Sequence, residues 1–133
     1  MIKQNTHLNI NNEISGEIMK LEKNYSKIKL KTTSDMIVDA KGLIHGGFIF
    51  SLADFASMVA INHPNVVLGS AQVKFLKPAR EGDVLIAEAN LTIKEGKKHM
   101  VKVNVSRDNE IIFNGDFTCF ILEKHVLEGD GDK

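Results

Sequence analysis

Residues 45–61, HGGFIFSLADFASMVAI, decide the fold of this chain. The stretch has the length of a helix and is apolar on every side, and Asp54 is the only ionisable residue between Phe48 and Ile61. A helix without a polar face has to be surrounded by protein, and a carboxylate is rarely buried without a partner or a task. We therefore expect a buried central helix whose single acid performs chemistry on a carbonyl group.

The composition places bounds on that role. The chain has 133 residues and a formal net charge of zero, which predicts one domain and gives no electrostatic reason to expect nucleic acid or an anionic membrane as a partner. Cys119 is the single cysteine, which excludes an internal disulfide and fits a reducing compartment. No signal peptide is evident at the start, and no apolar run approaches the roughly 20 residues of a membrane span. We expect a soluble, cytoplasmic protein.

The rest of the chain alternates with the period of β-strands. Alternating apolar and polar residues predict strands over 14–21, 25–32, 71–75, 84–93, 101–105 and 111–122. The helix is expected to stop near Asn62 and Pro64, because neither residue type continues a helix comfortably. The predicted fold class is α+β, with about six antiparallel strands in one curved sheet wrapped around one long central helix. Residues 13–123 form this single domain, between a flexible segment, residues 1–12, and a polar tail, residues 124–133.

A single bent sheet leaves one side of the helix open. Phe50, Asp54, Met58 and Ile61 are expected to point there, so we expect a second copy of the chain to cover them. Gly46 and Asp54 are separated by ~12 Å along a helix, so one chain cannot place both on one carbonyl. Two helices running antiparallel across a twofold axis would bring Asp54 of one subunit to Gly46 of the other. This geometry predicts a homodimer or a dimer of dimers with composite sites.

The two ends of such a composite site suit a thioester. Free backbone N–H groups of Gly46 and Gly47, at the positive end of the helix dipole, are expected to bind the carbonyl oxygen as it becomes an oxyanion. Asp54, partly desolvated by Phe50 and Met58, can act as a general base toward water or attack directly to give a mixed anhydride. The sequence leaves both routes open. No Cys/His spacing predicts a metal site.

Each of these residues also has a structural explanation. The two glycines would serve a tight entry into the helix, and His45 would be an ordinary structural histidine. Asp54 would be a buried carboxylate hydrogen-bonded to Ser51 or Ser57. The glycines and the acid taken together favour the catalytic interpretation.

The chain resembles a known family through His45-Gly46-Gly47, the segment FSLAD at residues 50–54 and VKFLKPAREGD at residues 73–83. These motifs are similar to those of the hotdog-fold acyl-CoA thioesterases, most closely the phenylacetyl-CoA (PaaI-type) branch. In that family the first motif glycine polarises the thioester carbonyl and the helix acid performs catalysis. The resemblance implies these roles for Gly46 and Asp54, with His45 shaping the site. It implies no separate cofactor, because coenzyme A is part of the substrate or ligand.

Two positions depart from the family pattern. Relatives commonly carry Asn or Gln six residues before the motif histidine, where this chain has Asp39. A second acid near Asp54 would raise the pKa of one of the two by like-charge repulsion. Relatives also often have a Ser or Thr that holds the attacking water, and Met58 and Gln72 stand at about those places. Gln72 can still hydrogen-bond a water, whereas Met58 cannot.

A function of another class stays open. The hotdog fold also serves as a non-catalytic acyl-CoA receptor, as in the effector domain of the lipid regulator FapR. About a dozen residues precede the first expected strand, too few for a helix-turn-helix, so a receptor is expected to act through another protein. Retention of Asp54 favours the enzyme. Hydratase or dehydratase chemistry ranks third, because no histidine lies on the buried helix face.

The ligand-binding residues follow from these expectations. The aromatic residues around Asp54 suit either an aryl pocket or a fatty-acyl channel, and they suit a core equally well. Basic residues near the turn at Pro78 are expected to meet the phosphates of coenzyme A, with solvated surface charge as the alternative. The residues expected to contact the substrate are Gly47, Asp39, Phe50, Met58, Gln72, Lys74, Lys77 and Arg80.

Overall fold

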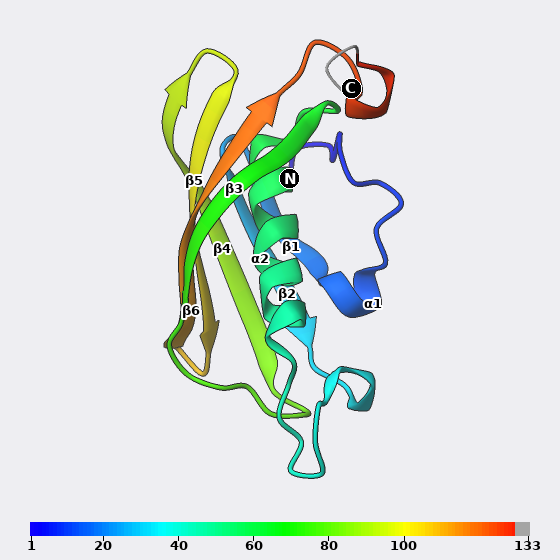
Figure 1. Ribbon diagram of the computed structural model, residues 1–133, viewed down its shortest axis with the longest axis vertical. Coiled ribbons are helices and arrows are strands. Elements are labelled where there is room, and N and C mark those ends of the chain that lie inside the picture. The colour runs from blue at the N-terminus through cyan, green and yellow to red at the C-terminus, as the bar shows by residue number, and fades with distance from the viewer. Residues whose placement is uncertain (130–133) are drawn as a thin grey trace.

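The computed structural model describes residues 1–129 and shows one six-stranded antiparallel sheet curved around a long helix (Figure 1). The strands are β1 (Glu17–Glu22), β2 (Tyr25–Lys31), β3 (Val66–Phe75), β4 (Val84–Glu95), β5 (Lys98–Arg107) and β6 (Glu110–Ile121). The helices are α1 (Asn12–Ser15), α2 (Gly46–Ile61) and the short 3-10 helices η1 (Ser34–Met36) and η2 (Val126–Glu128). The strand order β1-β2-β4-β5-β6-β3 makes β1 and β3 the two edges. The predicted α+β fold class is confirmed.

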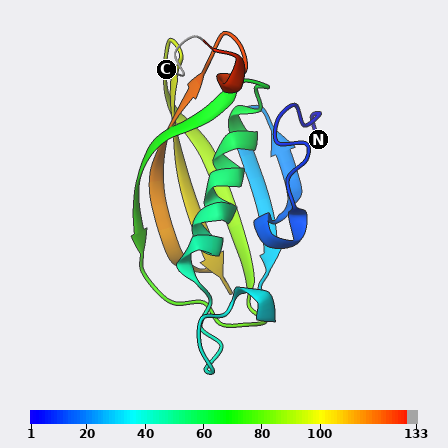
Figure 2. The same ribbon diagram turned by 45° about the vertical axis from the view of Figure 1, so that its right-hand side comes forward.

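The alternating side chains divide the sheet into two faces. In β2, Ile28 and Leu30 are buried while Lys29 and Lys31 are exposed. Ile28 pairs with the buried Ala87 of β4, so side chains of one face meet across the strands. Helix α2 lies along the concave face that these apolar residues line (Figure 2).

Helix α2 is the centre of the core, as its all-round apolar sequence predicts. Ala53, Ala56 and Ala60 are buried, and these small side chains let the helix backbone lie close to the sheet. The buried hydroxyl of Ser26 on β2 donates a 2.6 Å hydrogen bond to the carbonyl of Ala56. The helix ends at Asn62, which is in the left-handed region at φ 60° and donates its N–H to Met58 O.

The N-terminal segment covers one flank of α2. Thr6 is buried, His7 lies over Phe55 with their ring centroids 6.3 Å apart, and Ser15 Oγ lies 3.2 Å from Ser51 Oγ. Most of these contacts come from residues 1–12. The flexibility expected for these residues stays a prediction. They also decide which side of α2 remains open.

Some predicted boundaries were wrong. Residues 14 and 15 belong to α1 instead of the first strand, because Asn11 caps a short helical turn through its side chain and Gly16, at φ 105°, ends it. Strand β3 begins at residue 66 instead of 71, where a bulge between Leu68 and Ser70 interrupts the alternation. In the tail, residues 126–128 form η2, and residues 130–133 lie outside the described part. No helix among the described residues is long and apolar enough to cross a membrane.

Candidate active site

Two loops hold the start of α2. The N–H of His45 donates to Met36 O at 2.9 Å, and the N–H of Ile44 donates to Ala79 O at 3.0 Å. The backbone of His45 is extended and its imidazole makes no capping hydrogen bond. Within residues 1–129, the N–H groups of Gly46 and Gly47 donate to no protein acceptor. The helix therefore begins with two free donors at the positive end of its dipole.

Aromatic side chains lie close to both glycines at the start of α2. A Cβ atom on Gly46 would lie 3.2 Å from Phe75 Cε2, and one on Gly47 would lie 2.9 Å from His45 Nε2. The His45 ring also packs edge-on against Phe48, with centroids 6.1 Å apart. The rings of Phe75 and His45 thus lie next to the two glycines, which add no side chain of their own beside the free N–H groups.

Asp54 lies in the middle of α2 and is largely withdrawn from water. Its Oδ1 is the one buried side-chain oxygen or nitrogen in the described residues without a hydrogen-bond partner. Burial raises the pKa of Asp54 from 3.8 to about 6. An unpartnered buried carboxylate oxygen costs stability, and such costs persist most often at functional sites.

The two serines on α2 do not satisfy this carboxylate. Ser57 Oγ donates to the backbone carbonyl of Asp54 at 2.8 Å, and Ser51 Oγ pairs with Ser15. The structural explanation of Asp54 through a serine hydrogen bond is therefore not supported. Burial also raises the pKa of the nearby Cys119 thiol to about 12, so this buried thiol stays protonated and does not compete as a nucleophile.

Met58 is not on the open side of α2, and the prediction that placed it there was wrong. Its side chain is 1% exposed, whereas Phe50, Asp54 and Ile61 are only partly buried. At 100° per residue, Met58 is rotated ~40° from Asp54 toward Phe55, onto the flank that the N-terminal segment covers. Phe50 and Ile61 are rotated the other way and remain beside Asp54. Met58 is thus sealed inside the subunit.

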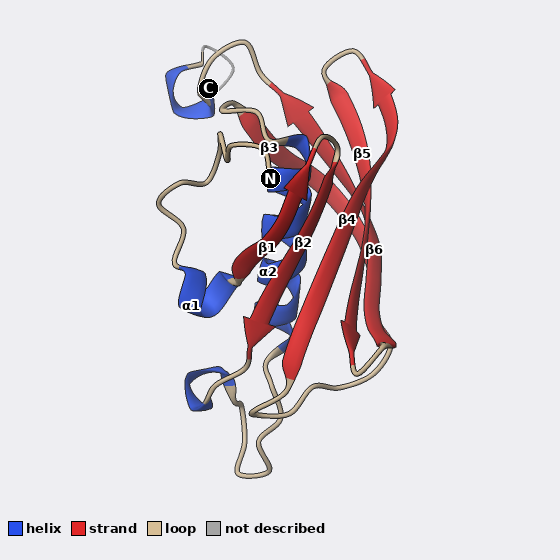
Figure 3. Ribbon diagram, turned by 180° about the vertical axis from the view of Figure 1, so that it is seen from behind, coloured by secondary structure: helices blue, strands red, loops and turns tan. Residues whose placement is uncertain are grey.

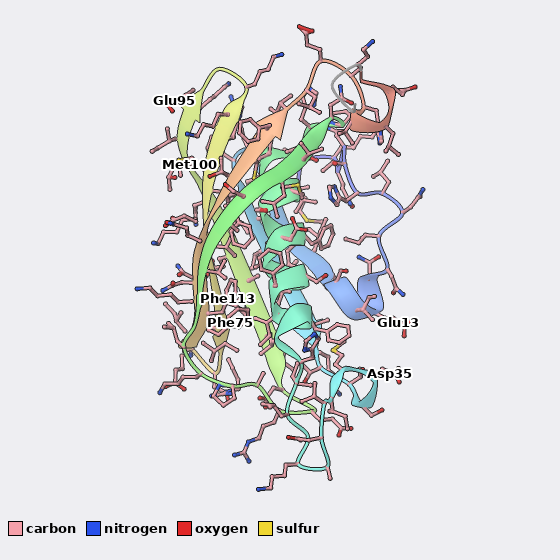
Figure 4. The ribbon with its side chains drawn as sticks, in the orientation of Figure 1. Glu13, Asp35, Phe75, Glu95, Met100 and Phe113 are labelled. Carbon is pink, nitrogen blue, oxygen red and sulfur yellow. The ribbon has the colours of Figure 1, made fainter. Side chains whose placement is uncertain are left out.

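A row of four phenylalanines connects the start of α2 to the neighbourhood of Asp54. Phe75 packs against Phe113 with ring centroids 5.0 Å apart. Both side chains are labelled in Figure 4. Phe113 lies 6.5 Å from Phe117, which lies 5.5 Å from Phe50, one turn before Asp54. Phe75 is 54% exposed, so this aromatic row borders a partly open surface between α2 and β3. The row begins at Phe75, beside Gly46, and ends at Phe50, one turn before Asp54. Gly46 itself lies about two turns before Asp54.

Asp39 does not lie near Asp54 in space within one subunit. Its Oδ1 accepts the N–H groups of Lys41 and Leu43, at 3.0 and 3.2 Å, and so closes its own exposed turn. Burial alone raises the pKa of Asp54, and like-charge repulsion from Asp39 has no part in it within one subunit. The expectation of an interacting acid pair is corrected accordingly.

Gln72 and Lys74 lie on the opposite face of the sheet from α2. Gln72 pairs with Asp116 and Lys74 with Asn114, and these side chains share an outer hollow with Lys102. Alternation along β3 instead directs its partly buried apolar residues toward the helix. The expectation that Gln72 holds a water beside Asp54 is therefore wrong for a single subunit.

Lys77 and Arg80 lie near the turn before β4, as expected. Lys77 is ion-paired with Glu110, which leaves it less free to bind a phosphate. The Arg80 side chain makes no hydrogen bond or ion pair within residues 1–129 and shares an open hollow with Asp39 and Lys41. A contact of either side chain with coenzyme A stays a prediction. In the part of the chain that the structure describes, no three His, Cys, Asp or Glu residues cluster as metal ligands.

A curved antiparallel sheet around one central helix is the hotdog fold. The chain belongs to the thioesterase superfamily, whose family model matches residues 41–112. The crystal structure of an uncharacterized protein, PH1136 from Pyrococcus horikoshii, is similar over 96% of this chain and 98% of that one, with 45% identity and a TM-score of 0.94. The PaaI protein of Escherichia coli, at 20% identity, covers 84% of this chain and 83% of its own with a TM-score of 0.77, and it shows the fold alone.

Two curated relatives are longer than this chain. A protein of Aquifex aeolicus named methylthioribose-1-phosphate isomerase is 50% identical over 119 residues, which are 89% of this chain and 26% of that protein. The transcription factor FapR of Caldanaerobacter subterraneus is 29% identical over 121 residues, covering 90% of this chain and 60% of FapR. The chain thus spans about a quarter of the first relative and about three fifths of the second.

Proposed function

We propose that this protein hydrolyses the thioester bond of an acyl-CoA, with Asp54 as the reacting acid. The observation that carries the proposal is the unpartnered buried oxygen of Asp54. Its pKa of about 6 leaves Asp54 mostly ionised at neutral pH and makes it a stronger base than an ordinary aspartate. Membership of the thioesterase superfamily supports the reaction class.

The proposed site is shared between two subunits. Gly46 and Asp54 are ~12 Å apart along α2, too far for both to act on one carbonyl. The surface beside Asp54, with Phe50 and Ile61, is only partly buried, and β3 offers the unpaired edge of the sheet next to it. A second copy related by a twofold axis would cover this surface and bring its own helix start to Asp54.

In this arrangement each group has one task. The free N–H groups of Gly46 and Gly47 of the partner subunit hold the thioester oxygen as it becomes negative. Asp54 takes a proton from water while the water oxygen attacks the carbonyl carbon. The C–S bond then breaks, and the departing thiolate receives that proton from Asp54. Direct attack by Asp54 on the carbonyl carbon would instead break the C–S bond, expel the thiolate and leave a mixed anhydride. Water would then hydrolyse the anhydride to the free acid and regenerate Asp54, with a proton passing to the thiolate.

The test measures thiol release from a panel of acyl-CoAs by the full chain and by an Asp54→Asn variant. We expect kcat for the best substrate to fall by a factor on the order of 10²–10⁴ while acyl-CoA binding survives. Asp35→Asn, an exposed change outside the site, serves as the matched control and should leave kcat unchanged. Equal hydrolysis by the unmodified protein and the Asp54→Asn variant would contradict the proposal.

The similarity to FapR supports a second candidate function, a non-catalytic acyl-CoA-binding regulatory protein. In that case the unmodified protein would bind an acyl-CoA, detected as a rise in melting temperature, without releasing thiol. The Asp54→Asn change would then alter only affinity or stability. The same two measurements therefore separate the two functions.

A further inference from the structure

Another hollow lies at the end of α2 farthest from Gly46. Its volume is about 320 Å³, within the range of small-molecule sites. The last turn of α2, the β1–β2 turn, the β4–β5 hairpin and the start of the chain meet around it. Figure 3 shows the start of the chain beside the far end of β1 and the last turns of α2. We call this hollow the end pocket.

The polar lining of the end pocket consists of nitrogen-bearing side chains. They are Lys23, Lys94, His63 and His99, with asparagines at positions 5, 24 and 62. Among the described residues, neither Asp nor Glu lines the end pocket. Lys23 and Lys94 form no ion pair within residues 1–129, and Glu22, next to Lys23 in sequence, is paired with Lys20 at 3.8 Å. Two lysine ammonium groups without an ion-pair partner place uncompensated positive charge at the pocket, which suits an anion.

The two histidines each present one free ring nitrogen. His99 is 5% exposed, and its Nδ1 lies 3.2 Å from the carbonyl of Lys97. A carbonyl only accepts, so Nδ1 carries the proton, and Nε2, which has no protein partner, is an acceptor that can take the P–O–H proton of a singly protonated phosphate. His63 Nδ1 accepts the N–H of Asn65 at 2.9 Å, so its Nε2 is the protonated nitrogen and a donor. The wall of the end pocket therefore offers one ring donor, His63 Nε2, and one ring acceptor, His99 Nε2, which together fit a phosphate that carries one proton.

The walls of the end pocket are held by hydrogen bonds between distant segments. Asn62 accepts the N–H of Asn5 at 2.7 Å and donates to the carbonyl of Lys3 at 2.8 Å. The carbonyl of Asn24 accepts the N–H of Leu91 at 3.0 Å, which ties the β1–β2 turn to β4. The pocket is therefore formed before a ligand enters, which lowers the entropy lost on binding.

Favourable interaction of cations with the negative end of the α2 dipole does not explain all of the polar residues that line the end pocket. Cations near the last turn of a helix interact favourably with its free carbonyls, and this effect would explain lysines alone. It requires neither a hollow nor the buried His99, which belongs to β5. We propose that the end pocket binds the phosphate group of a small phosphate-bearing molecule.

The phosphate has two possible sources. Ile61 lines the end pocket and lies on the same face of α2 as Asp54, ~10 Å farther along the axis. If an acyl-CoA binds in an extended form with its carbonyl at Asp54, its phosphates would reach the end pocket. This first source of the phosphate rests on the proposed function. The other source is a separate phosphate metabolite that binds the pocket alone.

Calorimetric titrations test the proposal on the full chain, with inorganic phosphate, adenosine 3′,5′-bisphosphate and coenzyme A as probes at constant ionic strength. We expect a Lys23→Ala/Lys94→Ala double variant to bind adenosine 3′,5′-bisphosphate at least about tenfold more weakly than the unmodified protein. The matched control is Lys29→Ala/Lys31→Ala, which removes two exposed lysines from β2. A His99→Gln variant should show the same loss, and the surface lysine variant keeps the test valid if that buried change prevents folding.

The outcomes separate the sources. A parallel loss of coenzyme A affinity supports the pocket and identifies the phosphates of coenzyme A. Unchanged coenzyme A affinity beside weakened bisphosphate binding supports the pocket and identifies a separate phosphate metabolite. No bisphosphate or phosphate binding at millimolar concentration, or an equal loss in the control, overturns the proposal. These readouts need no hydrolysis, so they stand apart from any failure of the proposed activity.

Discussion

Replacing Asp54 by asparagine removes a charge that the fold has taken out of water. Burial raises the pKa of Asp54 from 3.8 to about 6, so between these pH values the folded state holds a proton that the unfolded state has released. The contribution of protonated Asp54 to the free energy of unfolding is complete below about pH 4 and is lost as the pH rises through 6. A shift of about two pH units, at ~1.36 kcal/mol each, corresponds to ~3 kcal/mol at neutral pH.

The Asp54→Asn variant lacks this titration. We expect its free energy of unfolding, relative to the unmodified protein, to rise by up to ~3 kcal/mol between pH 4 and pH 7. Urea unfolding at pH 4, 5, 6 and 7, at one protein concentration, measures the difference. The control is Asp35→Asn, which changes an exposed aspartate (labelled in Figure 4) and measures the effect of losing one surface carboxylate. A constant or falling difference for Asp54→Asn would refute the assignment of a desolvated carboxylate.

The same site leads to further predictions. The value of kcat/KM should rise as pH increases through about 6 and then level off, because the carboxylate of Asp54 is the active form, and a pH–rate profile measures this. Gly46→Pro removes an N–H group that would bind the oxyanion, and the extended backbone of His45 tolerates a following proline, so kcat should fall ~10²–10³-fold. The control Gly46→Ala places the same Cβ near Phe75 but keeps the N–H group, so its kcat should fall less. Light scattering should show an even-numbered oligomer. Mixing inactive Asp54→Asn and Gly46→Pro subunits should restore up to about a quarter of the activity, since half the dimers then hold one intact composite site, whereas no recovery would place the site within one chain.

The sequence by itself determined the fold class and the two ends of the candidate site. Its period of two predicts strands, and a helix that is apolar all round has to lie at the centre of the sheet. The lone acid in that helix and the glycine pair before it stand out against their apolar surroundings, so the sequence alone predicts Asp54 and Gly46 as candidate site residues. Each of these inferences depends on residues close together in the chain.

Tertiary structure alone decided which flank of α2 stays open and where the remaining polar residues lie. Met58 and Asp54 differ by only ~40° around the helix, and contacts from the N-terminal segment at Phe55 and Ser51 cover one flank. Pairing with Asp116 places Gln72 on the outer face. The end pocket brings His99 of the β4–β5 hairpin together with the start of the chain, the β1–β2 turn, the end of α2 and the end of β6. A local pattern predicts that a side chain is buried, but it carries no information about which distant segment buries it, because that depends on long-range packing.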